Sequence, residues 1–242
     1  MKTPYRKCPS GEDLGGASFS MNQPSINIFG ILIQEPMCTL TDLTIAILCF
    51  FIYIKIGKSD NWNEKRLWRY YFFFMSAATF LGGLLGHAFL YCGSFALMKL
   101  PGWLSGMFAM SVLAQISIHL FFEKKNKRYF YFSIINILIF AIMLGLEVYN
   151  LAFNYVQIHS VLLLLLLILP LQASLIKQKD AFKSKNILFA LAIAGVGSFF
   201  FTNKIGLMPW FNHIDVSHVF LALSMYVISK SAFYEQGKLG NY

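Results

Sequence analysis

Three residues of the kinds that bind metals stand at the head of the last long apolar segment. His213, Asp215 and His218 lie within six residues at the start of FNHIDVSHVFLALSMYVISK, residues 211–230. Asp215 and His218 are three residues apart, so on a helix they would share one face. Imidazole and carboxylate groups are costly in hydrocarbon unless they pair, line water or hold a metal. The chemistry of this segment therefore depends on which other polar groups reach the same depth of a membrane.

The composition is that of a membrane protein. Of the 242 residues, 57% are hydrophobic and 13% are charged, whereas soluble domains are about 45–50% apolar and about 25% charged. The first thirty residues are polar and rich in Gly and Ser, so we expect no cleavable signal peptide. The formal net charge is +9, but the basic residues stand in short loops between apolar segments. That placement is a topology signal, and we expect no nucleic-acid partner.

Seven apolar segments are each long enough to cross a bilayer, which takes roughly 20 residues of helix. Short loops separate them, so the sequence predicts an all-α protein: a seven-transmembrane helix bundle over residues 31–242, after a polar N-terminal tail of residues 1–30. The predicted segments are approximately 40–57, 67–92, 102–122, 129–149, 155–176, 186–203 and 214–233.

The lysines and arginines predict the orientation of the bundle. Fifteen of them fall in the loops at 55–69, 123–128 and 177–185 and in the C-terminal tail, and five fall on the opposite side. Positive charge marks the cytoplasmic side of a membrane. We therefore expect the N-terminus outside and the C-terminus in the cytoplasm.

Most ionisable residues of the apolar segments would then share the outer half of the bundle. Ser76 would lie about three turns deeper on the second segment, and the inner halves are nearly all apolar, which argues against a polar relay across the membrane. The residues that converge come from five segments: Glu35, Asp42, His87, Glu147, His159, His213, Asp215 and His218.

His87 would complete a set of three histidines and one aspartate with the cluster at 213–218. Neutral imidazoles, a carboxylate and an open water position suit catalytic zinc, which lowers the pKa of its bound water to near 7 and polarises carbonyls. Spacing leaves structural explanations open as well. These are helix caps at Asp42 and Asp215, an interfacial ring at His213 beside Trp210, a helix-interface histidine at His159 and close packing at Ser76.

Three short motifs carry a resemblance to a known superfamily. EPMCTLTD (35–42), GGLLGHAF (82–89) and NHIDVSH (212–218) are similar to recurring pieces of a bacterial seven-span family. That family in turn resembles the alkaline ceramidases and adiponectin/progestin receptors, whose transmembrane zinc site uses a Ser and a His of the second helix, an Asp and a His pair of the seventh. The resemblance covers the first, second and seventh segments. The other four match only as hydrophobic spans.

The resemblance implies a zinc-dependent hydrolase that cleaves an amide or ester bond of a membrane lipid such as ceramide, in a bacterial inner membrane. His87, Asp215 and His218 would then be metal ligands, with His213 or His159 as the fourth. The remaining roles would be catalysis by Asp42, Ser76 or Asp215, and orientation of the ligands by Glu35, Glu147 and His159.

Two other functions fit the same residues. One is a receptor-like or sensor protein in which the metal only stabilises the bundle. The other is an ion- or proton-coupled carrier in which Glu147, His159 and Asp215 form a relay. The sequence also leaves open the oligomeric state and a disulfide between Cys38 and Cys92, because spacing does not fix connectivity.

Overall fold

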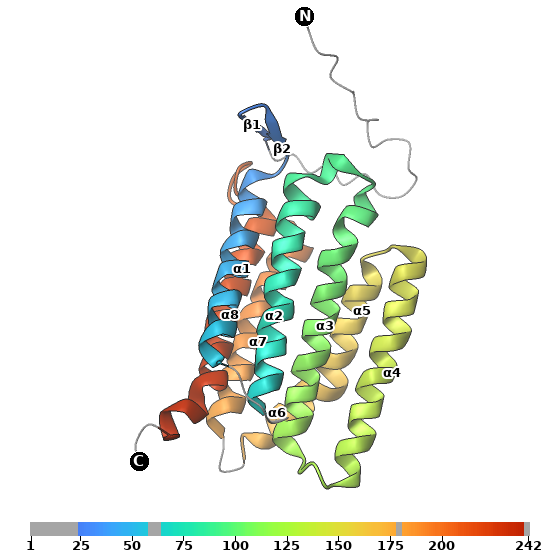
Figure 1. Cartoon of the computed structure of the whole chain (residues 1–242), viewed down its shortest axis with the longest axis vertical. Coiled ribbons are helices and arrows are strands. Elements are labelled where there is room, and N and C mark those ends of the chain that lie inside the picture. The colour runs from blue at the N-terminus through green and yellow to red at the C-terminus, as the bar shows by residue number, and fades with distance from the viewer. Residues whose placement is uncertain (1–23, 58–63, 178–180, 240–242) are drawn as a thin grey trace, which may run out of the picture.

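The computed structural model describes residues 24–57, 64–177 and 181–239, which form one helical bundle (Figure 1). Seven helical spans in these ranges are long and apolar enough to cross a membrane, which confirms the predicted all-α, multi-pass membrane protein. In chain order the elements are β1 (Ile26–Ile28), β2 (Ile31–Ile33), α1 (Pro36–Ile56), α2 (Glu64–Gly83), the π-helix η1 (Leu84–Ala88), the 3-10 helix η2 (Leu90–Cys92), α3 (Phe95–Phe121), α4 (Lys127–Asn150), α5 (Asn154–Leu163), the π-helix η3 (Leu164–Ile168), α6 (Leu169–Leu175), α7 (Ala181–Thr202) and α8 (His213–Leu239).

Proline lies near the start of two helices that begin earlier than the hydrophobic pattern predicted. α1 begins at Pro36, because proline at a first helical position has no N–H to leave unpaired and already has a helical φ. α3 begins at Phe95 and carries Pro101 in its second turn. Proline normally ends a helix, which is why the predicted segment started after it. Both extensions lengthen the bundle at the end where the polar residues lie.

A β-hairpin precedes the first span. β1 and β2 pair antiparallel, with Ile26 opposite Ile33, and the turn residues Phe29 and Gly30 have φ of 50° and 83°, as a type I′ turn requires. The predicted polar tail therefore has structure in its last residues. Its first 23 residues lie outside the described part of the chain. We call the end of the bundle that carries this turn the hairpin end.

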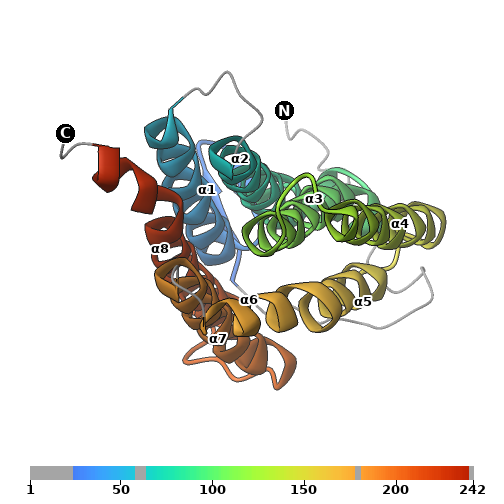
Figure 2. The ribbon, with the colours of Figure 1, turned by 90° about the horizontal axis from the view of Figure 1, so that it is seen from below.

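The first and last spans are neighbours. Figure 2 shows α1 to α4 in one curved row and α5 to α8 in a second row, joined where α4 meets α5 and where α8 meets α1. Gly197 allows α7 and α8 to approach closely, since a Cβ there would lie 2.9 Å from the Cβ of Phe220. This closure brings the heads of α1 and α8 together.

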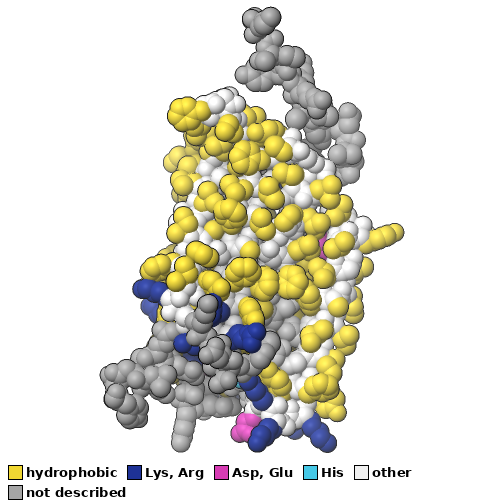
Figure 3. Space-filling view, in the orientation of Figure 1, with side chains coloured by type: hydrophobic (Ala, Val, Ile, Leu, Met, Phe, Trp, Pro, Cys, Tyr) yellow, Lys and Arg dark blue, Asp and Glu magenta, His cyan; other side chains and the backbone are white. Residues whose placement is uncertain are grey.

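Large apolar side chains fill the middle of the bundle, and others cover its outside (Figure 3). The fully buried ones include Trp68, Phe72, Leu113, Leu163 and Ile187. Because lipid is as apolar as these side chains, van der Waals packing and interhelical hydrogen bonds, rather than the hydrophobic effect, hold the spans together.

Lysine and arginine side chains gather at the opposite end, which we call the basic end (Figure 3). There Lys183 of α7 donates to both carboxylate oxygens of Glu64 on α2, at 2.9 and 2.8 Å. The indole N–H of Trp68 donates to the same carboxylate at 2.9 Å. This nearly buried ion pair fastens α2 to α7 and has no part in the polar cluster at the hairpin end.

Candidate metal site

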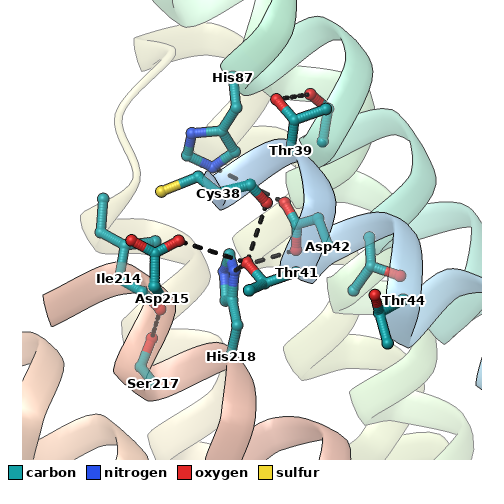
Figure 4. Close-up of polar contacts among 12 residues, drawn as sticks. Cys38, Thr39, Thr41, Asp42, Thr44, His87, Ile214, Asp215, Ser217 and His218 are labelled. Atoms are coloured by element: carbon teal, nitrogen blue, oxygen red, sulfur yellow. Dashed lines mark hydrogen bonds and ion pairs between the residues drawn. The ribbon is translucent and has the colours of Figure 1, made fainter. Parts of the chain in front are cut away.

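Three side chains meet at the hairpin end: Asp42, His87 and His218 (Figure 4). They come from the N-terminal part of α1, from the π-helix η1 and from the N-terminal part of α8. Their side chains are between 6% and 14% exposed. Asp42 lies between the two imidazole rings, whose centroids are 6.1 Å apart. The carboxylate that the two histidines share is therefore that of α1.

A π-helix and a glycine set this arrangement locally. The second span widens after Gly83 into η1, where the N–H of Phe89 donates to the carbonyl oxygen of Leu84 at 2.9 Å. Such π-helical turns are frequent at functional sites because they redirect side chains, and His87 lies within this one. A Cβ at Gly83 would lie 3.0 Å from the Cβ of Asp42. The glycine thus makes room for Asp42 beside η1.

Both histidines turn Nε2 toward Asp42. The Nε2 atom of His218 lies 3.4 Å from Asp42 Oδ1, and that of His87 lies 3.7 Å from Asp42 Oδ2. These separations exceed the 2.7–3.2 Å typical of N–H···O hydrogen bonds. Each Nε2 atom therefore faces a different oxygen of the same carboxylate without a direct hydrogen bond to it.

The other ring nitrogen of each histidine has a partner. His87 Nδ1 contacts the Glu35 carboxylate, and His218 Nδ1 lies 2.9 Å from the Thr41 hydroxyl. Metal-binding histidines almost always use their second nitrogen in this way, which fixes the orientation and tautomer of the ring. Glu35 and Thr41 therefore hold both rings with Nε2 directed at Asp42.

Thr41 can complete this role because it has other acceptors in reach. Its hydroxyl lies 3.0 Å from the carbonyl oxygens of Met37 and Cys38. When it donates to one of these, it accepts from the Nδ1–H of His218. Nε2 of His218 then keeps its electron pair for a cation.

Asp215 is fully buried and anchors the first turn of α8. Its Oδ2 accepts from the N–H of Asn212 at 2.8 Å, and the side chain of Asn212 accepts from the N–H of Ile214 at 2.7 Å. This is the reciprocal arrangement of a capping box. Its Oδ1 lies 3.5 Å from the Thr41 hydroxyl. Asp215 thus reaches the site through Thr41, while Asp42 occupies the central position.

Cys38 adds a thiol to the cluster. Glu35, Cys38 and His87 are all buried, and one ligand atom of each lies within 4.8 Å of the others. Glu35 also contacts Nδ1 of His87, so the thiol of Cys38 lies beside the imidazole that faces Asp42. Cys38 and Cys92 are both free thiols, the first buried and the second exposed, so the disulfide that the sequence left open is not formed.

The cluster carries excess negative charge. Glu35, Asp42 and Asp215 are 4% exposed or less. Lys99 of α3 supplies a positive charge that interacts with Glu35 and Asp42, and its stem passes Gly86, where a Cβ would lie 3.3 Å from the lysine Cγ. Three buried carboxyl groups around one lysine call for protons or a cation, and a divalent metal would stabilise their ionised form.

Four residues that the sequence singled out lie away from this cluster. Ser76 donates to a main-chain carbonyl of α1 at 2.9 Å, which joins α1 to α2. The ring of His213 packs 5.9 Å from that of Phe201 on α7. Glu147 and His159 are buried in the part of the bundle formed by α3, α4 and α5.

Sequence reasoning did not assign Cys38, Thr41 or Lys99 to the site. A signal for Cys38 is its spacing, since Glu35, Cys38 and Asp42 stand at i, i+3 and i+7 and so share one helix face. No comparable pattern identifies Thr41 or Lys99, because their partners come from other helices.

Comparisons with known proteins return a family without an assigned activity. The model of a family described as a family of unknown function, DUF6962, matches residues 37–234. That range contains Cys38, Asp42, His87 and His218. No curated protein and no solved structure matches the chain.

Proposed function

We propose that this chain, which belongs to the DUF6962 family, is a membrane-embedded hydrolase that holds a divalent transition metal, zinc by preference, and cleaves an amide or ester bond of a lipid. One observation carries the proposal. Two histidines from different helices each use Nδ1 for a hydrogen bond and direct Nε2 at the same carboxylate, the arrangement expected of metal ligands.

The spacing between each imidazole nitrogen and the nearer oxygen of Asp42 fits such a metal. Zinc binds nitrogen and oxygen at about 2.0–2.2 Å, so two ligand atoms of a tetrahedral site lie about 3.3–3.5 Å apart. The observed Nε2–Asp42 separations of 3.4 and 3.7 Å are close to this value. Imidazole and carboxylate together suit zinc rather than calcium. Asp42, His87 and His218 would hold the ion and leave the fourth position open for water.

A bound zinc ion supplies a Lewis acid that polarises a carbonyl and lowers the pKa of water. The protein's own groups do the rest. Glu35 and Thr41 keep the imidazole rings in place, and Asp215, which is buried beside Thr41, is the carboxylate available to accept and return a proton. Lys99 balances the charge of the cluster.

The depth of the site supports a lipid substrate. Asp42 is the seventh residue of α1 and His218 the sixth of α8, so both lie about 8–9 Å below the first residue of a span. The polar linkages of lipids lie near the edge of a hydrocarbon core about 30 Å thick. If the basic end (Figure 3) faces the cytoplasm, as the positive-inside rule predicts, the site would lie in the outer leaflet and, in a bacterial inner membrane, would face the periplasm.

Metal content tests the proposal first. The detergent-purified protein should contain about one zinc per chain, and His218→Ala should lose it. With cobalt in place of zinc, the wild type should show the d–d bands of a tetrahedral site, and His218→Ala should lose them. Loaded protein should cleave fluorogenic lipid amides or esters. A folded wild type that binds neither ion would refute the proposal.

A sensor or receptor with a structural metal is the second candidate. The observation that favours it is the number of donors: with Glu35 and Cys38 the cluster has more than the four that close a tetrahedral zinc site. It predicts that the loaded protein cleaves no lipid and that a chelator lowers the melting temperature. Cleavage that depends on the metal would exclude it.

A further inference from the structure

The helix α4 buries only polar side chains. Of its 24 residues, the buried ones are Asn136 and Glu147. The others are half-buried or exposed and mostly apolar, and Tyr129, Phe132 and Ile139 pack against the core. A helix in lipid turns polar residues inward only where they meet partners, water or an ion. The sequence predicted that the cytoplasmic halves of the spans are nearly all apolar. The interface that α4 forms with α3 and α5 (Figure 2) nevertheless contains polar groups well beyond the hairpin end.

Glu147 and Asn136 mark two levels of this interface. They are eleven residues apart, about three helical turns or 16 Å on the same face. Glu147 is 0% exposed, and neither of its carboxylate oxygens has a hydrogen-bond partner among the described residues. Asn136 donates to the carbonyl oxygen of Ser111 at 3.0 Å, but its own Oδ1 has no partner there.

His159 of α5 meets the same serine. Its Nε2 lies 3.2 Å from the Ser111 hydroxyl, and its Nδ1 has no partner in the described part of the chain. The ring lies 5.8 Å from that of Phe140, about 10 Å along α4 from Glu147. Ser111 therefore joins α3, α4 and α5 at mid-bundle.

The polar groups continue to the basic end. Gln115, one turn after Ser111 on α3, donates to the Ser133 hydroxyl at 2.9 Å and to the Tyr129 hydroxyl at 3.1 Å. His119, a further turn along, packs its ring 6.2 Å from that of Tyr129. The titratable groups on this path are thus Glu147 and Tyr129 on α4, His159 on α5 and His119 on α3.

Interhelical hydrogen bonds commonly hold membrane helices together, but such bonds satisfy the groups involved. Here four buried atoms of Glu147, Asn136 and His159 have no hydrogen-bond partner within residues 24–57, 64–177 and 181–239. Burying these atoms without a hydrogen bond would cost free energy of folding. Buried water molecules commonly supply the missing hydrogen bonds of such groups. A carboxylate, an imidazole, hydroxyls and a phenol connected by water can pass a proton along hydrogen bonds.

We propose that the interface of α3, α4 and α5 is a hydrated proton path that runs from Glu147 through His159 and Ser111 to Tyr129 and His119. A proton enters at Glu147 from the hairpin end and leaves at the basic end, or the reverse, as the gradient dictates. The path shares no residue with the metal site and does not depend on hydrolase activity.

Proton flux into vesicles tests this path. Wild type is reconstituted into liposomes that contain a pH-sensitive dye, and a potassium diffusion potential drives protons inward. Wild type should change the internal pH faster than protein-free liposomes. Glu147→Gln and His159→Phe should lower the initial rate at least about tenfold, because a positioned proton-transfer group contributes about 10² or more. The exposed loop residue supplies the matched control, Glu123→Gln, which should keep the wild-type rate.

His87→Ala separates this path from the metal site, since it removes a metal ligand and should leave the flux intact. Variants are compared only where they elute as a single peak at the wild-type volume. If Glu147→Gln does not, His159→Phe on the neighbouring helix decides. Wild-type flux equal to that of empty liposomes, wild-type rates in the folded variants, or loss of flux in His87→Ala would each overturn the proposal.

Discussion

Removal of the Thr41 hydroxyl tests the geometry of the metal site at one atom. Thr41→Val keeps the β-branched shape but deletes the 2.9 Å contact with Nδ1 of His218. The ring then loses the group that fixes its orientation and tautomer. Loss of such a partner typically weakens metal binding about 10–100-fold, or about 1.4–2.7 kcal/mol. Thr41→Ser retains the hydroxyl and should bind zinc nearly as well as wild type.

The assay is competition for zinc between the metal-stripped protein in detergent and a chromophoric chelator. The matched control is Thr44→Val, which makes the same exchange about one turn further along α1. Thr44 is exposed and its hydroxyl donates to the carbonyl oxygen of Leu40 at 2.8 Å, away from the cluster. Zinc affinity of Thr41→Val within error of wild type, or an equal loss in Thr44→Val, would refute the assigned role of Thr41.

Three further variants probe separate parts of the structure. Gly83→Ala should lower the melting temperature, because its Cβ would meet that of Asp42 at 3.0 Å and overpacking costs about 1–3 kcal/mol; zinc affinity should fall with it. Glu64→Gln removes the charge of the carboxylate that accepts from Lys183 and Trp68, so thermal unfolding should occur earlier while zinc content stays unchanged. Asp215→Asn keeps an acceptor for the capping N–H, so the protein should fold and bind zinc, while lipid cleavage should fall about 100-fold or more.

Each of these expectations has its own contrary result. Unchanged stability in Gly83→Ala would show that α1 can move away from η1. The control is Glu123→Gln at an exposed position. A melting temperature of Glu64→Gln equal to that of this control would show that other contacts of Lys183 suffice. Full activity in Asp215→Asn would leave Asp215 as a helix cap only.

The sequence by itself determined the class of protein and the number of spans. Every bilayer has a hydrocarbon core of similar thickness, so a span needs about 20 apolar residues wherever it lies in the chain. The seven segments could therefore be located from local hydropathy to within a few residues. The starts of α1, α3 and α7 lie about four to seven residues before the predicted ones, and Pro36 and Pro101 account for the first two. The gathering of Asp42, His87 and His218 near one end of the bundle was visible for the same reason, since depth follows from position along a span.

Tertiary structure alone decided which of these residues face one another. The three-residue spacing between Asp215 and His218 predicted that Asp215 is a metal ligand. In the structure its carboxylate caps α8, and Asp42 of α1 faces both histidines instead. The direction of His87 depends on a π-helical turn. The polar interface at Glu147 depends on which face of α4 meets α3 and α5. Helix periodicity fixes which residues share a face, but only the packing of helices distant in the sequence fixes what that face meets.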